Sequence, residues 1–361
     1  MRKRSKALII TSSILVGIAF TYFGGSVIAY SVIEDKFFNS RGSDESVINE
    51  DPYYFLQNTW NDYTDLHSRE IIDVNHRNLT LKSYLYRTPN PKGLIISVHG
   101  VKTLADSDHA QYQNYFLHKG YDVMSLDLIG CGRSEGNGMV GLEESRFCVS
   151  SLLSKIKEIE DIKDLPKSII GHSWGAYGAV TATYDNDDVS SVIAFGGYDE
   201  PANMMVGFAR NYAWDGLIVG KPGLDFALNI LKGGKVFLNA SNVIKTNTHI
   251  DYFVIHGKKD NVVSLNNYSI YSNVVNKNYS NVKTRLLESH GHTGLWRTKA
   301  ANDMLNEYEK RYNELQEEYN YNIPPEIKDS FIEGIDKDKS SELNLELLDE
   351  IENYIENSMT K

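Results

Sequence analysis

The sequence predicts an α/β protein with a mostly parallel β-sheet that is covered by helices on both faces. Short apolar segments alternate along the chain with longer segments whose apolar residues recur at helical spacing, and this alternation is typical of a parallel sheet with crossover helices. The expected strands are 71–74, 79–86, 93–98, 121–127, 168–170, 189–195, 252–256 and 282–287, and the expected helices are 112–118, 142–159 and one that begins at 176.

Each element has its own signal in the sequence. The first two strands flank Asn75-His76-Arg77-Asn78, which predicts an antiparallel hairpin. The helix over 142–159 follows from apolar residues three and four positions apart, among them Leu142, Leu152, Ile156 and Ile159. In a parallel sheet, reactive groups gather at the carboxyl ends of the strands, so the residues that follow each strand are the first to consider for function.

Composition and charge exclude several classes of protein. A chain of 361 residues with 41% apolar residues can bury a substantial core, and it is expected to be globular. A net charge of −11 argues against a nucleic-acid partner, since binding to phosphates needs clustered Lys and Arg. Two cysteines, Cys131 and Cys148, form no disulfide framework, and we expect free thiols, although the two could pair if they met.

The N-terminus predicts a membrane anchor. Arg2, Lys3, Arg4 and Lys6 precede an uncharged run over 7–33, which is long enough to cross a hydrocarbon layer as a helix. No small-residue cleavage motif follows, so an uncleaved single-pass anchor over 1–34 is favoured over a cleaved signal peptide. The basic flank should stay cytoplasmic and leave the rest of the chain on the outer face. Residues 35–69 are then a juxtamembrane spacer, in which Tyr53, Tyr54, Phe55 and Trp60 indicate packing onto the domain.

The segment Gly171-His172-Ser173-Trp174-Gly175 carries the strongest functional signal. It follows the apolar run 168–170 directly, as a sharp turn from a strand into a helix would. Such a turn needs flanking residues without Cβ atoms, and it exposes the central hydroxyl at the edge of the sheet. Ser173 is therefore the candidate nucleophile.

Together with three other motifs and a terminal histidine in the same order, this segment resembles the α/β-hydrolase family, over about residues 70–310. Val98-His99-Gly100 is similar to the family's oxyanion loop, 127–136 (Asp-Leu-Ile-Gly-Cys-Gly-Arg-Ser-Glu-Gly) to its Asp-x-x-Gly-x-Gly-x-Ser turn, and 256–263 to its acid loop. Gly291-His292 resembles the terminal histidine. The resemblance implies the α/β-hydrolase fold for a domain over 70–320, with Ser173, Asp260 and His292 as catalytic residues and the backbone N–H groups of Val101 and Trp174 as the oxyanion hole.

Alternatives remain open at two of these positions. Asp199 or Glu200, after the preceding strand, could supply the carboxylate, and His290 could be the base in place of His292. We expect His172 to point into the packing between sheet and helix, and His99 to act as a hydrogen-bonding scaffold for its loop. No cofactor and no metal is expected, because no two histidines have the ligand spacing of a zinc site.

Two further segments flank the catalytic motifs. Apolar residues over 198–249 are expected to form a helical cap that roofs the active site and, as a set, to suit an acyl group; they are Met204, Met205, Val206, Phe208, Trp214, Leu217, Ile218, Leu224, Phe226, Leu228, Ile230 and Leu231. Residues 321–361 form an acidic helical extension. There Asp336 begins a pattern like a calcium loop, but Ser341 and Leu347 break it, so we expect a turn before a helix.

These observations predict a membrane-anchored serine hydrolase of the carboxylesterase or lipase type. It should cleave a carboxylic ester through an acyl-enzyme intermediate, and a lipid-like acyl ester is one candidate. The alternatives are a peptidase or amidase on the same fold, and a surface binding protein without activity.

Overall fold

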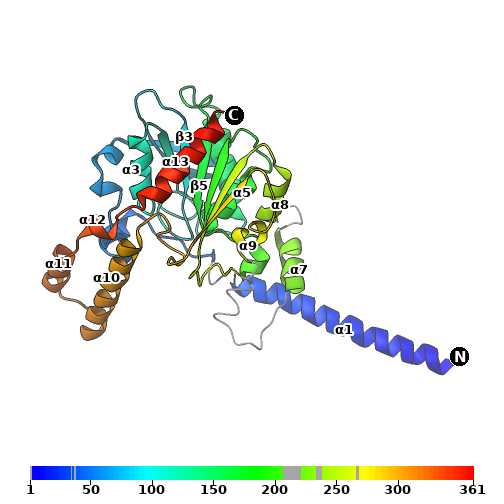
Figure 1. The fold of residues 1–361 in the computed structure, drawn as a ribbon. Helices are drawn as coiled ribbons and strands as arrows, with labels where there is room; N and C mark the ends of the chain where they lie inside the picture. The colour runs from blue at the N-terminus through cyan, green and yellow to red at the C-terminus, as the bar shows by residue number, and fades with distance from the viewer. Residues whose placement is uncertain (1, 34, 36–37, 206–220, 233–237, 266–267) are drawn as a thin grey trace.

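An eight-stranded sheet forms the centre of the computed structural model, which describes residues 2–33, 35, 38–205, 221–232, 238–265 and 268–361 (Figure 1). The strand order is β1-β2-β4-β3-β5-β6-β7-β8. The pairs β1–β2 and β2–β4 are antiparallel and the remaining pairs are parallel, which confirms the hairpin and the mostly parallel sheet. The strands are β1 (Glu70–His76), β2 (Leu79–Tyr86), β3 (Leu94–Val98), β4 (Asp122–Leu126), β5 (Lys167–His172), β6 (Ser191–Phe195), β7 (Asp251–Gly257) and β8 (Val282–Leu287).

Helices cover both faces of this sheet, as predicted. Because successive side chains of a strand point to opposite faces, Ile96 and Ile169 join one apolar cluster while Ile95 and Ile170 join another. The first cluster includes side chains of α4 (Glu144–Ile156), α5 (Trp174–Ala182), α8 (Ala240–Thr246) and α9 (Ile270–Val274), and the second includes those of α3 (Ala110–His118) and α13 (Leu345–Met359). The central strands β3 to β7 are buried along their whole length, as is typical of a parallel sheet covered on both sides.

The segment before the sheet is folded onto the domain through short helical turns, η2 (Glu45–Asn49), α2 (Pro52–Phe55), η3 (Trp60–Asp62) and η4 (Thr64–Ser68). Tyr54, Phe55 and Leu56 are buried, and the ring of Phe55 meets that of Tyr312 at 5.1 Å. Packing of the aromatic residues in this segment agrees with the expectation from sequence.

The C-terminal residues form α10 (Lys299–Glu318), α11 (Pro325–Glu333), α12 (Lys337–Ser340) and α13. Asp336 accepts a hydrogen bond from the backbone N–H of Lys339 and caps α12, so it stands at a turn before a helix as expected. Leu347, Leu348 and Ile351 of α13 are buried against the sheet, so this helix docks on the domain itself.

At the other end of the chain, α1 (Arg2–Ile33) projects from the body of the molecule (Figure 1). Among the described residues, its segment Ser12–Val32 is the one helical stretch long and apolar enough to cross a membrane, with a mean hydropathy of 1.6 and 6% of it buried. Tyr30, near the end of α1, is fully buried in the first apolar cluster. The helix α7 (Lys221–Lys232), in the region of the expected cap, lies against α1.

Candidate active site

Ser173 stands at a strained turn between β5 and α5. Its φ of 55° lies in the left-handed region, which few residues other than glycine adopt. A Cβ on Gly171 would lie 2.4 Å from the carbonyl oxygen of Gly175, and one on Gly175 would lie 2.2 Å from that of Val98. The two glycines are therefore required by the close approach of backbone to backbone, as the sequence pattern predicted.

Three loops at the carboxyl ends of β5, β7 and β8 bring the predicted side chains together. The Nε2 atom of His292 lies 2.8 Å from Oγ of Ser173, and its Nδ1 atom lies 2.7 Å from Oδ2 of Asp260. Both distances fit a hydroxyl whose proton an imidazole can accept, with a carboxylate that orients the ring. Ser173 and Asp260 are almost fully buried, at 6% and 8% exposure.

The carboxylate of Asp260 is held by its own loop as well as by His292. Its Oδ1 accepts hydrogen bonds from the backbone N–H groups of Val262 and Val263, at 2.9 and 2.8 Å, and Nε2 of His256 lies 3.3 Å from Oδ2. Burial alone would raise the pKa of Asp260, but the hydrogen bonds from His256 and His292 and their charge hold the pKa below its usual value. Asp260 is therefore ionised at neutral pH.

His172 has a closer relation to this group than the sequence predicted. It is buried, but its Nε2 lies 2.9 Å from the backbone carbonyl oxygen of His292, to which it must donate. Burial, assisted by the charge of His292, lowers the pKa of His172 to about 3. The ring is thus neutral, and it bonds to the backbone of His292. The expectation that it simply fills the space between sheet and helix missed this contact, because nothing in the local sequence marks a partner 120 residues away.

The alternatives left open by the sequence are not brought to Ser173. Nε2 of His290 bonds to the carbonyl oxygen of Arg297 at 3.0 Å. The carboxylate of Asp199 accepts from the backbone and hydroxyl of Ser241, at 2.6 and 3.0 Å, and burial raises its pKa to about 6. Glu200 bonds to the amide of Asn203.

His99 is the scaffold that the sequence predicted. Its Nδ1 lies 2.7 Å from the carbonyl oxygen of Gly100, and its Nε2 accepts from the backbone N–H of Leu128 at 2.9 Å. Burial lowers the pKa of this ring to about 4, so it stays neutral. The loop after β3 is thereby fixed to the loop after β4.

A cavity of about 170 Å³ opens onto Ser173. Val101 contributes to its wall, and Trp174 follows Ser173 at the first turn of α5 with its indole N–H bonded to the carbonyl oxygen of Leu142. The cavity is lined by Tyr53, Gly100, Val101, Thr103, Leu142, His172, Ser173, Tyr198, Met204, Val262, His292 and Thr293. No local pattern predicted that Tyr53 would reach this cavity, since this residue lies in the segment before the sheet.

The expected cap contributes little of this lining among the described residues. Met204 is in the wall and Met205 is buried nearby, whereas Phe226, Ile230 and Leu231 of α7 are exposed to solvent. For those three residues the expectation that the cap lines an acyl pocket is wrong, because α7 packs on α1 and contributes no described side chain to the cavity wall. Val206, Phe208, Trp214, Leu217 and Ile218 lie outside the described residues, as do the side chains of Leu224 and Leu228.

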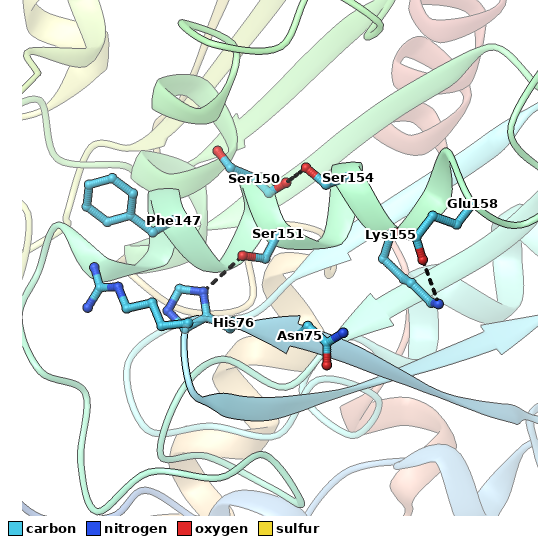
Figure 2. Close-up of a pocket in the computed structure, with 9 residues that line it drawn as sticks. Asn75, His76, Phe147, Ser150, Ser151, Ser154, Lys155 and Glu158 are labelled. Carbon is cyan, nitrogen blue, oxygen red and sulfur yellow. Dashed lines mark hydrogen bonds and ion pairs between the residues drawn. The ribbon is translucent and has the colours of Figure 1, made fainter.

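A larger groove, of about 370 Å³, lies between the β1–β2 hairpin and α4 and contains none of these side chains. Figure 2 shows that several of its polar residues are paired with one another: Nδ1 of His76 lies 3.0 Å from Oγ of Ser151, and Lys155 pairs with Glu158 at 2.9 Å.

Two buried clusters of the described chain have the residue types of a metal site. One joins His76, Glu144 and Cys148, and the other joins Asp108, His109 and His172. In the first, both ring nitrogens of His76 already have partners, Ser151 and Glu144. In the second, the carboxylate of Asp108 lies 3.2 Å from Nε2 of His109 and accepts a hydrogen bond from Tyr53. Hydrogen bonds thus account for most of these polar atoms, and the absence of a metal stays a prediction.

Cys131 and Cys148 are both buried and unpaired, which confirms free thiols. Burial raises the pKa of Cys131 to about 12 and that of Cys148 further. Neither thiol is therefore reactive at neutral pH.

Comparison with known proteins gives the fold. Residues 89–211 match the family described as serine aminopeptidase, S33. No curated protein matches the chain. A Pyrococcus furiosus esterase superposes with a TM-score of 0.50 at 16% identity, covering 78% of this chain and 97% of that one. Two further structures are similar: Est1E from Butyrivibrio proteoclasticus with ferulic acid bound (TM-score 0.46, 17% identity, 66% and 98% covered) and the Pyrococcus horikoshii acylaminoacyl peptidase (0.48, 15%, 62% and 37%).

Proposed function

This chain is a hydrolase with the α/β-hydrolase fold, and we propose that it is a serine esterase that cleaves carboxylic esters through an acyl-enzyme intermediate. The observation that carries the proposal is the continuous chain of hydrogen bonds from Ser173 through His292 to Asp260. A serine hydroxyl is a weak nucleophile until a neighbouring base takes its proton, and this arrangement supplies that base.

The proposed reaction has two halves. In the first, Nε2 of His292 takes the proton of Ser173 as Oγ attacks the ester carbonyl; the ring then gives the proton to the leaving alcohol, and the acyl group stays on Oγ. In the second, His292 takes a proton from water, the resulting hydroxide attacks the acyl carbonyl, and Ser173 regains its proton as the acid leaves. The ionised Asp260 stabilises the imidazolium that forms in each half.

Two backbone N–H groups would stabilise the oxyanion, those of Val101 and Trp174. Support comes from their positions: Val101 lines the cavity beside Gly100, and Trp174 begins α5 directly after Ser173. Donors aimed at the developing negative charge contribute about 100- to 1,000-fold each to the rate of acyl transfer.

The lining of the cavity favours an ester over the N-terminus of a peptide. An aminopeptidase, the alternative that the family description raises, needs a negative group for the substrate's amine. The described residues around the cavity include neither Asp nor Glu, and most of the side chains are apolar or aromatic. This composition suits an uncharged acyl or alcohol group.

We further propose that α1 anchors the enzyme in a membrane with the hydrolase domain on the outer face. Support comes from the uncharged run after Arg2, Lys3, Arg4 and Lys6, and from the exposure of Ser12–Val32 outside the body of the domain. A cleaved signal would place the domain on the same side without the attachment.

The test is labelling of the full-length protein by a fluorophosphonate, together with hydrolysis of p-nitrophenyl esters of increasing chain length. The wild type should be labelled at Ser173 and should hydrolyse the esters, whereas Ser173→Ala should lose labelling and at least about 10,000-fold of kcat. Ser154→Ala, on the exposed side of α4, is the control and should behave as wild type. Amino-acid p-nitroanilides measure the aminopeptidase alternative. An unlabelled wild-type protein, or a labelled Ser173→Ala, would contradict the proposal.

A further inference from the structure

The cap helix α7 packs on the helix that we propose spans the membrane. The ring of Phe226 meets that of Phe23 at 4.6 Å, and the backbone N–H of Gly223 donates to the hydroxyl of Tyr22 at 3.2 Å. The two helices touch so closely at Gly223 that a Cβ there would lie 2.2 Å from Oγ of Ser26. Figure 1 shows α7 beside the end of α1 that enters the domain.

The length of α1 places this contact at the edge of the membrane. A hydrocarbon layer of about 30 Å takes about 20 helical residues, and 20 residues counted from the end of the basic flank at Lys6 reach about Ser26. Tyr30, one turn further on, is already buried in the core of the domain. The positions of α1 that touch α7, from Tyr22 to Ser26, therefore lie where the helix leaves the lipid.

The exposed face of α7 is apolar at this level. Phe226, Ile230 and Leu231 are 38%, 58% and 42% exposed, and they fall within an arc of about 140° around the axis of α7. Gly223 and Ala227 lie within the same arc and are buried, so this side of α7 is partly covered and partly exposed. On α1, Ile18 and Phe20 are 61% and 81% exposed. Exposed apolar side chains thus lie on both helices, which contact each other at Phe23 and Phe226.

We propose that α7 lies in the surface of the same lipid bilayer that α1 crosses, with Phe226, Ile230 and Leu231 inserted among the acyl chains. The proposal rests on the proposed membrane anchor and deepens the proposed function, since it assigns the substrate class: esters dissolved in the lipid, which the enzyme meets at the membrane surface. Inserting an apolar helix face at the boundary between headgroups and acyl chains is favourable in proportion to the apolar area that it buries.

The position of α7 can be measured on the full chain in vesicles of phosphatidylcholine. Cys131 and Cys148 are buried and protonated, so a single cysteine introduced on the surface is labelled selectively with an environment-sensitive fluorophore. Three variants are compared: Val16→Cys in the middle of α1, Ile230→Cys on α7, and Leu345→Cys at the start of α13, which lies on the far side of the domain from α1. Lipids that carry a nitroxide quencher at a shallow or a deep position report the depth of each label.

We expect the label at 230 to be quenched mainly by the shallow nitroxide, the label at 16 mainly by the deep one, and the label at 345 by neither. Quenching of the label at 16 without quenching of the label at 230 would overturn the insertion of α7 and leave the anchor intact. The same result is expected if a second copy of the chain or another protein covers the exposed side of α7. No quenching at 16 would overturn the anchor itself. Neither outcome depends on catalysis, so both are separate from a failure of the esterase proposal.

The substrate class has its own test. The triple variant Phe226→Ser, Ile230→Ser and Leu231→Ser should lose at least about tenfold in the rate on a long-chain ester embedded in vesicles, and should keep the wild-type rate on soluble p-nitrophenyl acetate. The matched control, Ile71→Ser, Tyr321→Ser and Leu345→Ser, removes exposed apolar side chains from other faces and should leave both rates unchanged. Equal rates of the two triple variants on the embedded ester would refute the assignment.

Discussion

At the scale of single residues, the site depends on the buried ring of His172, which stays neutral beside His292. His172 donates from Nε2 to the backbone carbonyl oxygen of His292, and in the neutral ring this requires the tautomer with its proton on Nε2. A charged ring would have to be buried beside the imidazolium that forms on His292 during the proposed reaction. Burial, which lowers the pKa of His172 to about 3, keeps the ring in the required state across the physiological range.

The same burial makes the fold sensitive to acid. In the unfolded chain His172 takes up a proton near its ordinary pKa of 6.5, while in the folded chain it does so only near 3. Between these values the unfolded state binds more protons, so the free energy of unfolding falls as the pH falls, by up to about 1.4 kcal/mol per pH unit for each such group. His99, with a pKa lowered to about 4, acts in the same direction. We therefore expect the melting temperature of the full-length protein in detergent to fall from pH 7 to pH 5.

His172→Gln separates this contribution, because the amide can still donate to the carbonyl oxygen of His292 but does not titrate. Its melting temperature should depend less on pH between 7 and 5 than that of the wild type. His67→Gln is the control, since it makes the same substitution at a histidine that is exposed in the folded chain. An unchanged pH dependence in His172→Gln would show that burial of this ring is not what couples the fold to acid.

At the scale of elements, α13 closes one face of the sheet although it comes last in the chain. Its side chains Leu347, Leu348, Ile351 and Ile355 are at most 2% exposed, and they belong to the apolar cluster that contains Ile170 and Phe253 of the central strands. Replacing Ile351 by Ala should therefore lower the free energy of unfolding by about 2–5 kcal/mol. Leu345→Ala, on the exposed side of the same helix at 56% exposure, should change it by less than about 0.5 kcal/mol. Thermal unfolding measures both, and equal shifts would mean that α13 is not part of the cooperative core.

Elements with a local signal could be predicted from the sequence. Each central strand is a short apolar run, and Ser173 sits between two glycines that the turn requires, so both stood out locally. Contacts between distant segments could not be found in this way. Tyr53 reaches the cavity at Ser173 from a segment before the sheet, and the bond between His172 and His292 joins loops that local patterns treat separately. The apolar positions of α7 predicted an amphipathic helix, but they did not predict that this helix would pack on α1.

At the scale of the whole molecule, α1 and the hydrolase domain share a core. Tyr30 is fully buried among residues of the sheet and its helices, and Val27 packs against the same cluster. The helix α1 thus has two parts with different surroundings: a projecting part, exposed apart from the domain, and a final part that the domain encloses. The position of α7 on α1 extends this joint to the cap. The proposed membrane attachment and the proposed cap are then mechanically linked through the contact of α1 with α7.

This joint predicts how the protein responds to truncation. Deletion of residues 2–16 removes only the projecting part of α1 and should leave the melting temperature of the domain in detergent unchanged. Deletion through residue 34 also removes Tyr30 and the partners of α7, and loss of a buried aromatic side chain costs about 3–5 kcal/mol, so the melting temperature should fall. Tyr30→Ala in the full chain isolates the aromatic contribution and should reproduce most of the fall. If the two truncated proteins have the same melting temperature as the full chain, α1 is a tether outside the core and the cap does not depend on it. If only the longer deletion lowers the melting temperature, soluble forms of this enzyme must retain the last turns of α1.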